Sequence, residues 1–290
     1  MLIGGIEAGG TKMVCAVADE NGSIKDRITI PTTQPAETME TMMSYFKKKD
    51  IAALGIGSFG PLDLNPTSAT YGYITQTPKP GWQNTNFAGM FSETLGIPVA
   101  IDTDVNAAIL GEVTWGAAKN CDTAIYITIG TGIGVGVYCN GTLLHGMTHP
   151  EAGHILMRRH PTDNFQGNCP YHADCFEGLA SGPALEARYG VKASSLADNP
   201  KVWTLEAYYI GQAITNYILT YSPQKIILWG GVMHQSQLFP LIHKNVHEML
   251  NGYIYHENLN NMDQYILPPA LGENPGILGA IKLGMQALEE

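Results

Sequence analysis

Two short glycine turns, each between apolar strand-forming segments, constrain the fold of this chain more than any other feature. The first turn is residues 9–11 and the second is residues 130–134. The segments that flank these turns and are predicted as strands are residues 2–7, 13–19, 123–129 and 135–139. Their β-branched and apolar content is typical of buried strands. Because the strand–turn–strand unit occurs twice, we predict an internally duplicated α/β fold.

The remaining chain alternates strand and helix patterns, as α/β proteins do. Further strands are predicted at residues 27–30, 53–58, 98–101 and 225–228, and helices at 36–49, 87–95, 105–116, 203–221, 238–250 and 277–288. Residues 145–183 read as irregular. We expect two domains: residues 1–116 with the C-terminal helix at about 275–290, and residues 117–274.

Composition excludes several classes of function. The 290 residues carry a formal net charge of −10, and only 14% of them are charged. Nucleic acids and anionic membranes require clustered cations, so neither is an expected partner. No apolar run approaches the roughly 20 residues of a membrane span, and the N-terminus lacks a signal-peptide pattern. We therefore expect a cytoplasmic protein. Five cysteines, an odd number, do not suggest a disulfide framework.

The glycine turns are candidate phosphate sites. Glycine lets a ligand approach the backbone, whose N–H groups can then bind phosphate oxygens. At the first turn, Thr11 adds a hydroxyl and Lys12 a charge beside Gly9 and Gly10; the alternative is a plain hairpin turn. No helix follows, so this is not a Walker A loop.

The second turn, which contains Thr131 and Gly132, resembles a dinucleotide-binding fingerprint only superficially. That fingerprint requires a helix directly after the glycines, whereas a strand follows here. A phosphate-binding hairpin fits better. Gly230 and Gly231, directly after a predicted strand, are either a turn or an opening for a flat ligand.

Carboxylates form a second group of candidates. Thr103 and Asp104 stand between a predicted strand and a helix. They are interpreted either as a helix N-cap or as the site of a carboxylate that accepts a proton from an alcohol during phosphoryl transfer. Glu151, His154 and Glu177 could pair with sugar hydroxyls, although isolated glutamates are more often surface residues.

Three soft or borderline metal ligands, Cys169, His172 and Cys175, follow one another at intervals of three residues. Such spacing in a reducing compartment predicts a zinc site. His154 or His160 would be the fourth ligand. Four protein ligands leave no open position for water, so the zinc would be structural. A catalytic zinc site, as in a hydrolase, is the alternative.

In combination, these motifs resemble the ROK family of repressors and sugar kinases, and within it the fructokinases. The resemblance covers nearly the whole chain. It implies an actin-like (ribonuclease H-like) ATPase fold of two domains, with a central cleft and a zinc loop. It also implies an ATP-dependent hexose kinase that acts most readily on D-fructose, with Mg²⁺ accompanying ATP and structural Zn²⁺. Relatives of this kind are often homodimers.

The resemblance further implies roles for single residues. Asp104 would be the general base, and Thr103, Glu151, His154 and Glu177 would contact the sugar. His154 would also complete the zinc site, in preference to His160. ATP would contact Gly9, Gly10, Thr11, Lys12, Thr131, Gly132, Gly182, Gly230 and Gly231.

Two positions depart from the family pattern. Glu7 replaces the usual aspartate of the first phosphate motif, which puts direct metal contact there in question. Thr103 replaces the usual asparagine before the base, which weakens a glucokinase assignment. A glucose- or mannose-type kinase and a non-catalytic sugar sensor are the alternatives. A DNA-binding repressor is not expected, because the chain begins at the first phosphate strand.

Overall fold

The computed structural model describes residues 1–289. Contacts group the chain into two compact units: unit 1 is Met1–Asn120, Leu143–Pro150 and Ala270–Glu290, and unit 2 is Cys121–Thr142 and Glu151–Pro269. Leu143–Pro150 thus groups with unit 1, whereas the division expected from the sequence assigned it to the second domain. That expected division, at residues 116 and 275, stays a prediction about folding domains.

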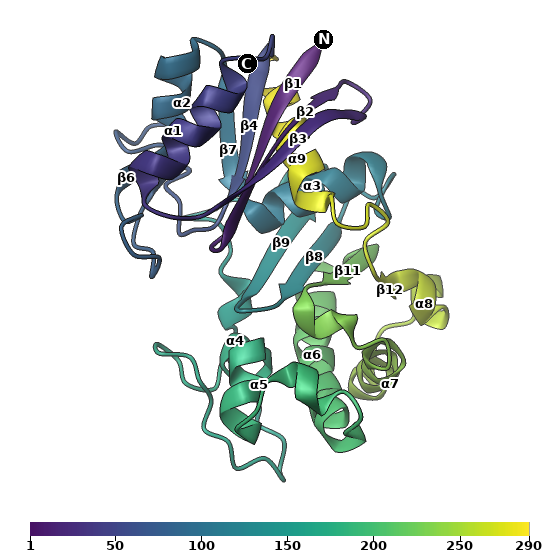
Figure 1. Ribbon diagram of the computed structural model, residues 1–290. Helices are drawn as coiled ribbons and strands as arrows, with labels where there is room; N and C mark the ends of the chain where they lie inside the picture. Colours follow the sequence, from purple (N-terminus) through teal and green to yellow (C-terminus); the bar gives the residue numbers. More distant parts are fainter. Residues whose placement is uncertain (290) are drawn as a thin grey trace. The chain divides into compact units, whose positions relative to one another are not determined.

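Unit 1 is built on a five-stranded sheet in the order β3-β2-β1-β4-β7 (Figure 1). The strands are β1 (Leu2–Ala8), β2 (Lys12–Asp19), β3 (Ile24–Pro31), β4 (Ala53–Ser58) and β7 (Val99–Thr103). β1 pairs antiparallel with β2 and parallel with β4, and β4 pairs parallel with β7. A separate pair of short strands, β5 (Tyr73–Ile74) and β6 (Thr85–Asn86), also belongs to this unit.

The central sheet of unit 2 has the order β10-β9-β8-β11-β12. Its strands are β8 (Ala124–Ile129), β9 (Ile133–Cys139), β10 (Thr142–Leu143), β11 (Lys225–Trp229) and β12 (Ile266–Leu267). β8 pairs antiparallel with β9 and parallel with β11, and β11 pairs parallel with β12. The two sheets therefore repeat one strand order and one set of directions, which confirms the predicted duplicated α/β fold.

Four helices of at least nine residues accompany the unit 1 sheet: α1 (Pro35–Phe46), α2 (Phe87–Leu95), α3 (Asp104–Trp115) and α9 (Pro275–Gln286). Met39, Met42 and Phe46 of α1 are buried in one core with Ile6 of β1. Helix α9 packs on β1, β4 and α3, and its Ile281 is buried with Ile3 of β1. The methionine spacing of α1 therefore marks core, as apolar residues at helical spacing predict.

The helices of unit 2 are α4 (Phe176–Ala180), α5 (Gly182–Tyr189), α6 (Pro200–Tyr221), α7 (Leu238–Leu250) and α8 (Met262–Tyr265), with 3₁₀ turns η1 (Ala152–His154), η2 (Ala193–Leu196), η3 (Gly231–His234) and η4 (Glu257–Asn260). The prediction that residues 145–183 are irregular was wrong at its end, where α4 and the first turn of α5 form. Among residues 1–289, no helix combines the length and apolarity needed to cross a bilayer.

Glycine allows α9 to lie directly on the sheet of unit 1. A Cβ added to Gly55 of β4 would stand 1.8 Å from the carbonyl oxygen of Ala280 and 2.4 Å from the nitrogen of Gly284. Both neighbours are backbone atoms of α9, so neither can turn aside. A hydrogen atom at position 55 is therefore a condition of this packing.

We expect Gly55→Ala to lower the apparent Tm by about 5 °C or more, because the added methyl group would force α9 away from β4. Thermal unfolding followed by circular dichroism measures this. Gly146→Ala is the control, since a Cβ there would meet only the Thr148 carbonyl oxygen at 3.9 Å. Equal Tm values for the two variants would contradict the packing argument.

Candidate active site

The first glycine turn joins β1 to β2 and leaves its tip exposed. Ala8 pairs with Met13, and the Gly9 N–H donates to the Lys12 carbonyl at 3.0 Å, which closes the hairpin. A Cβ at Gly10 would meet nothing within 4 Å. Thr32, the residue directly after β3, supports the turn, since its hydroxyl donates to the Gly9 carbonyl at 2.7 Å. The geometry leaves space at Gly10 for a ligand to approach the backbone.

Glu7, the last but one residue of β1, lies against the first turn of α9. Its carboxylate accepts a backbone hydrogen bond from Ile277, and removal from water raises its pKa. A Cβ at Gly276 would stand only 2.7 Å from the Glu7 carboxyl carbon. The α9 N-terminus thus holds this side chain, and a Mg²⁺ contact by Glu7 stays an open prediction.

The corner between β7 and α3 carries the predicted general base. Thr103 is the N-cap of α3, because its Oγ1 accepts from the Asn106 N–H at 3.1 Å. Asp104 is the first helical residue, and its Oδ1 accepts from the Val105 N–H at 2.9 Å. Of the two capping candidates, threonine therefore caps the helix. Asp104 stands in the first turn, where the helix dipole favours an ionised carboxylate.

His145 was not predicted as a site residue, yet it contacts this corner. Its Nε2 lies 2.8 Å from Oδ2 of Asp102, which is the residue two before Asp104. This hydrogen bond to Asp102 raises the pKa of His145. The only signal in the sequence was the abundance of histidine after residue 144, which has no defined spacing to Asp102.

The second glycine turn joins β8 to β9 and is held by a predicted sugar ligand. Gly130 N–H donates to the Gly132 carbonyl at 2.9 Å, and Gly182 N–H donates to the Gly130 carbonyl at 2.8 Å. Glu177 of α4 accepts from the Ile133 N–H at 2.9 Å through Oε2. The structure thus brings Gly182 and Glu177 to this turn.

The predicted sugar ligands Glu151 and His154 flank the same strand start. His154 belongs to η1, and Glu151 is its N-cap residue. A Cβ at Gly153 would stand 1.9 Å from the Ile133 carbonyl oxygen, so η1 packs on β9 only because residue 153 is glycine. Backbone groups of Ile133 therefore connect η1, Glu177 and the glycine turn within unit 2.

Gly230 and Gly231 have different roles. Gly230 has a φ of +103°, and a Cβ there would stand 2.4 Å from the Ile129 carbonyl oxygen, so this position requires glycine structurally. A Cβ at Gly231 would meet nothing within 4 Å. Gly231 is thus the position of the pair where a ligand has room.

Four candidate metal ligands, His154, Cys169, His172 and Cys175, have donor atoms that all lie within 4.8 Å of one another. The His154 Nδ1 atom is 3.7 Å from Cys169 Sγ and 3.5 Å from Cys175 Sγ. Zn–S bonds of 2.3 Å and Zn–N bonds of about 2.05 Å in a tetrahedron give S···N edges of about 3.6 Å. The donor set therefore fits a tetrahedral metal ion.

His160, the other candidate for the fourth ligand, is engaged elsewhere. Its Nδ1 pairs with Thr162 Oγ1 at 2.9 Å, and its ring packs edge-on against Tyr208.

Burial raises the pKa of the Cys175 thiol to about 11. A metal ion must therefore displace a proton from this thiol, which thiolate-binding metals do on binding.

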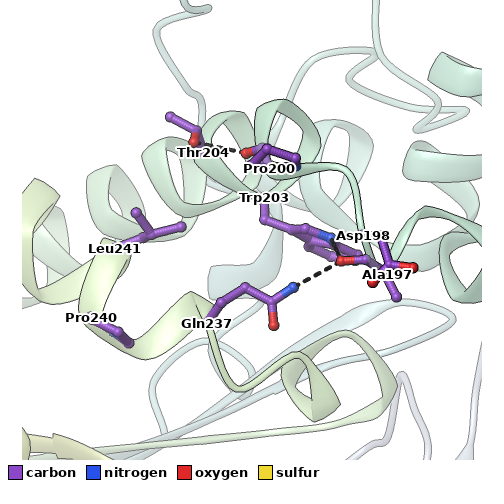
Figure 2. A pocket seen from close by; sticks show the side chains of 8 residues that line it. All are labelled: Ala197, Asp198, Pro200, Trp203, Thr204, Gln237, Pro240 and Leu241. Atoms are coloured by element: carbon purple, nitrogen blue, oxygen red, sulfur yellow. Dashed lines mark hydrogen bonds between the residues drawn. The ribbon is translucent and has the colours of Figure 1, made fainter.

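One pocket, of about 400 Å³, lies apart from these residues at the N-terminal ends of α6 and α7 (Figure 2). Gln237 spans it, because its side-chain amide donates to the Ala197 carbonyl at 3.2 Å. No residue predicted from the sequence to bind a ligand lines this pocket, whose walls are Ala197, Asp198, Pro200, Trp203, Thr204, Gln237, Pro240 and Leu241.

Two sheets of identical strand order, each with a glycine hairpin, define the class as an actin-like α/β fold, which here carries a Cys/His cluster able to hold a metal ion. The model of the ROK family matches residues 3–287, and the chain belongs to this family. A protein named fructokinase from Pediococcus pentosaceus is 48% identical over 289 residues, covering 100% of this chain and 99% of the relative. Another from Streptococcus mutans is 46% identical, covering 99% and 97%.

A solved structure has the same fold. The ROK hexokinase from Thermus thermophilus matches with a TM-score of 0.83 at 26% identity, covering 100% of this chain and 99% of that one. The match extends over the whole chain, so the actin-like fold inferred from the motifs is confirmed.

We expect Cys169→Ser and Cys175→Ser each to reduce bound metal from about one ion per chain to a small fraction, because a hydroxyl is a poor ligand for a thiolate site. Elemental analysis of the purified protein measures this. Cys139→Ser is the matched control, since Cys139 lies on β9 outside the cluster. Unchanged metal content in both cluster variants would rule out the site.

Proposed function

We propose that this protein is an ATP-dependent hexose kinase that converts D-fructose and ATP to D-fructose 6-phosphate and ADP. The observation that carries the proposal is the near-complete alignment with proteins named fructokinase. The local geometry supports it, because a carboxylate at a helix N-terminus and two glycine hairpins supply the groups that phosphoryl transfer to an alcohol needs.

Asp104 is the proposed general base. Its carboxylate would take the proton from the 6-hydroxyl as the hydroxyl oxygen forms a bond to the γ-phosphorus of ATP. The bond between the γ-phosphorus and the bridging oxygen breaks, and its electron pair leaves on ADP. The position of Asp104 in the first turn of α3 supports this role, because a helix N-terminus favours a negatively charged side chain.

The two hairpins are the proposed phosphate sites. Gly9, Gly10, Thr11 and Lys12 of the first hairpin and Thr131 and Gly132 of the second are the proposed ATP contacts, and Gly230 and Gly231 would line the adenosine site. Gly182 would let ATP approach the backbone closely, but it would not donate a hydrogen bond to ATP, since its N–H donates to the Gly130 carbonyl. ATP would bind as its Mg²⁺ complex, which neutralises charge that develops on the phosphates.

Glu151, His154 and Glu177 are the proposed sugar ligands, together with Thr103. His154 turns Nδ1 toward the cysteine sulfurs, which leaves Nε2 for a sugar hydroxyl. Glu177 uses Oε2 for the Ile133 N–H and keeps Oε1 for the sugar. His154 and Glu177 thus each have one side-chain atom with a protein partner and a second that could bind substrate.

The metal is proposed to be structural Zn²⁺, held by His154, Cys169, His172 and Cys175. Two sulfur and two nitrogen donors at tetrahedral spacing match closed zinc sites, in which no position remains for a reactive water. This geometry disfavours a zinc hydrolase. A homodimer stays a prediction.

Asp104→Asn should lower kcat by about 10²- to 10⁴-fold, because an amide cannot accept the hydroxyl proton. A coupled ADP-release assay with fructose measures the change. Asp263→Asn is the control, as Asp263 also stands in the first turn of a helix but is 90% exposed on α8. Near-normal turnover of a folded Asp104→Asn variant would remove Asp104 from the role of base.

For the substrate, kcat/KM on fructose should exceed the values on glucose, mannose and N-acetylmannosamine by at least about tenfold, or 1.4 kcal/mol. The same assay provides this comparison. Preference for glucose or mannose would retain the kinase and discard the fructose assignment. Absence of turnover on every sugar by folded, metal-loaded protein would instead favour a sugar sensor.

A further inference from the structure

A buried carboxylate and a histidine form an ion pair directly beside the proposed base. The Asp102 side chain is 4% exposed and that of His145 is 41% exposed, with Nε2 and Oδ2 2.8 Å apart. The His145 ring also makes a hydrogen bond with the backbone of Leu143. Both contacts favour the doubly protonated ring and so raise the pKa of His145.

Asp102 connects this histidine to the residues around Asp104. Its Oδ1 accepts from the Thr103 N–H at 2.7 Å and from the side-chain amide of Asn106 at 2.8 Å. These two donors lie on either side of Asp104, one at the end of β7 and one in the first turn of α3. The direction of Asp104 therefore depends on a carboxylate whose second oxygen is held by His145.

The segment that carries His145 is fixed to unit 1 at a second point. His149 accepts from the Leu62 N–H at 3.2 Å through Nε2, next to the loop that contains Gly60. Pro150 ends this segment, and the next residue in the chain is Glu151, a proposed sugar ligand. His145 and His149 therefore determine where the chain leaves unit 1 before Glu151.

We propose that His145 is a positioning residue for phosphoryl transfer to the sugar. Paired with Asp102, it holds the β7–α3 corner in the geometry that directs Asp104, and it anchors the segment that leads into Glu151. This inference rests on the proposed kinase function. It assigns to His145 an effect on the sugar side of the reaction and none on ATP binding.

The test compares His145→Ala and His145→Gln in steady-state kinetics. His145→Ala should lower kcat/KM for fructose by about 10- to 100-fold, because a misplaced base loses the near-attack geometry. The KM for ATP should stay within about twofold. His145→Gln should recover much of the loss, since its amide N–H can still donate to Asp102 Oδ2.

Removing both partners tests the connection itself. Asp102→Asn alone should impair fructose turnover, and the double variant with His145→Ala should be no worse than the more impaired single variant. That non-additivity is expected when two residues act through one hydrogen bond. Fully multiplicative losses would overturn the proposed connection.

A second His–Asp pair provides the matched control. His243 of α7 places Nδ1 3.2 Å from Asp263 Oδ1 and Nε2 2.9 Å from the Ile266 carbonyl oxygen, so its ring has the same two kinds of partner. His243→Gln should leave kcat and both KM values unchanged, whatever it does to Tm.

The outcomes separate this inference from the proposed function. If the wild-type protein and His145→Ala turn over fructose, or another preferred hexose, equally well, then His145 is structural at most and the inference fails alone. A lower Tm of His145→Ala with unchanged fructose kinetics would likewise show a purely structural role and contradict the inference alone. If the wild-type protein phosphorylates no hexose, the proposed function fails first and the inference fails with it.

Discussion

The site in unit 1 depends on a backbone-to-backbone contact between α3 and α9, two helices that are far apart in the sequence. A Cβ at Gly279 would stand 1.5 Å from the Ala107 carbonyl oxygen, and one at Gly111 would stand 2.5 Å from the Pro275 carbonyl oxygen. Helices approach this closely only where glycine removes the side chain. Because α3 begins at Asp104, packing of the C-terminal helix α9 on α3 supports the placement of the proposed base. The first turn of α9 also contacts Glu7.

In unit 2, Cys175 links the candidate metal cluster to the second glycine turn. Its Sγ accepts from the Gly178 N–H at 3.4 Å and so caps α4, whose second residue is Glu177. Glu177 in turn holds the Ile133 N–H at the start of β9. A metal ion that fixes Cys175 therefore acts on the glycine turn through one short helix. The proposed structural metal would thus be connected to the proposed ATP and sugar contacts without taking part in the chemistry.

Local signals predicted most of the fold, and they failed where contacts are non-local or the composition is unusual. The hairpins at Gly10 and Gly132 follow from glycine between apolar strands, and the ligand spacing from Cys169 to Cys175 is visible in the sequence. The choice of His154 as fourth ligand needed the family resemblance. The pair of His145 with Asp102 joins a loop to a strand end, and no periodic pattern encodes such a contact. Helices α4 and α5 were missed in part because they are short and lie among cysteine, glycine and proline.

The irregular segment between His154 and Cys169 is also anchored through Asp163, which is not one of the candidate metal ligands. Asp163 accepts from the Tyr209 hydroxyl at 2.6 Å and pairs with Arg188, whose guanidinium also donates to the Leu179 carbonyl at 2.7 Å. Nearby, burial raises the pKa of Glu206 well above its usual value, and its carboxyl oxygens have no hydrogen-bond partner among residues 1–289. Since burial disfavours the charged form of Glu206, Asp163 is the carboxylate that pairs with Arg188. The segment is thus tied to α5 and α6 at Asp163 through contacts that involve none of the four candidate metal ligands.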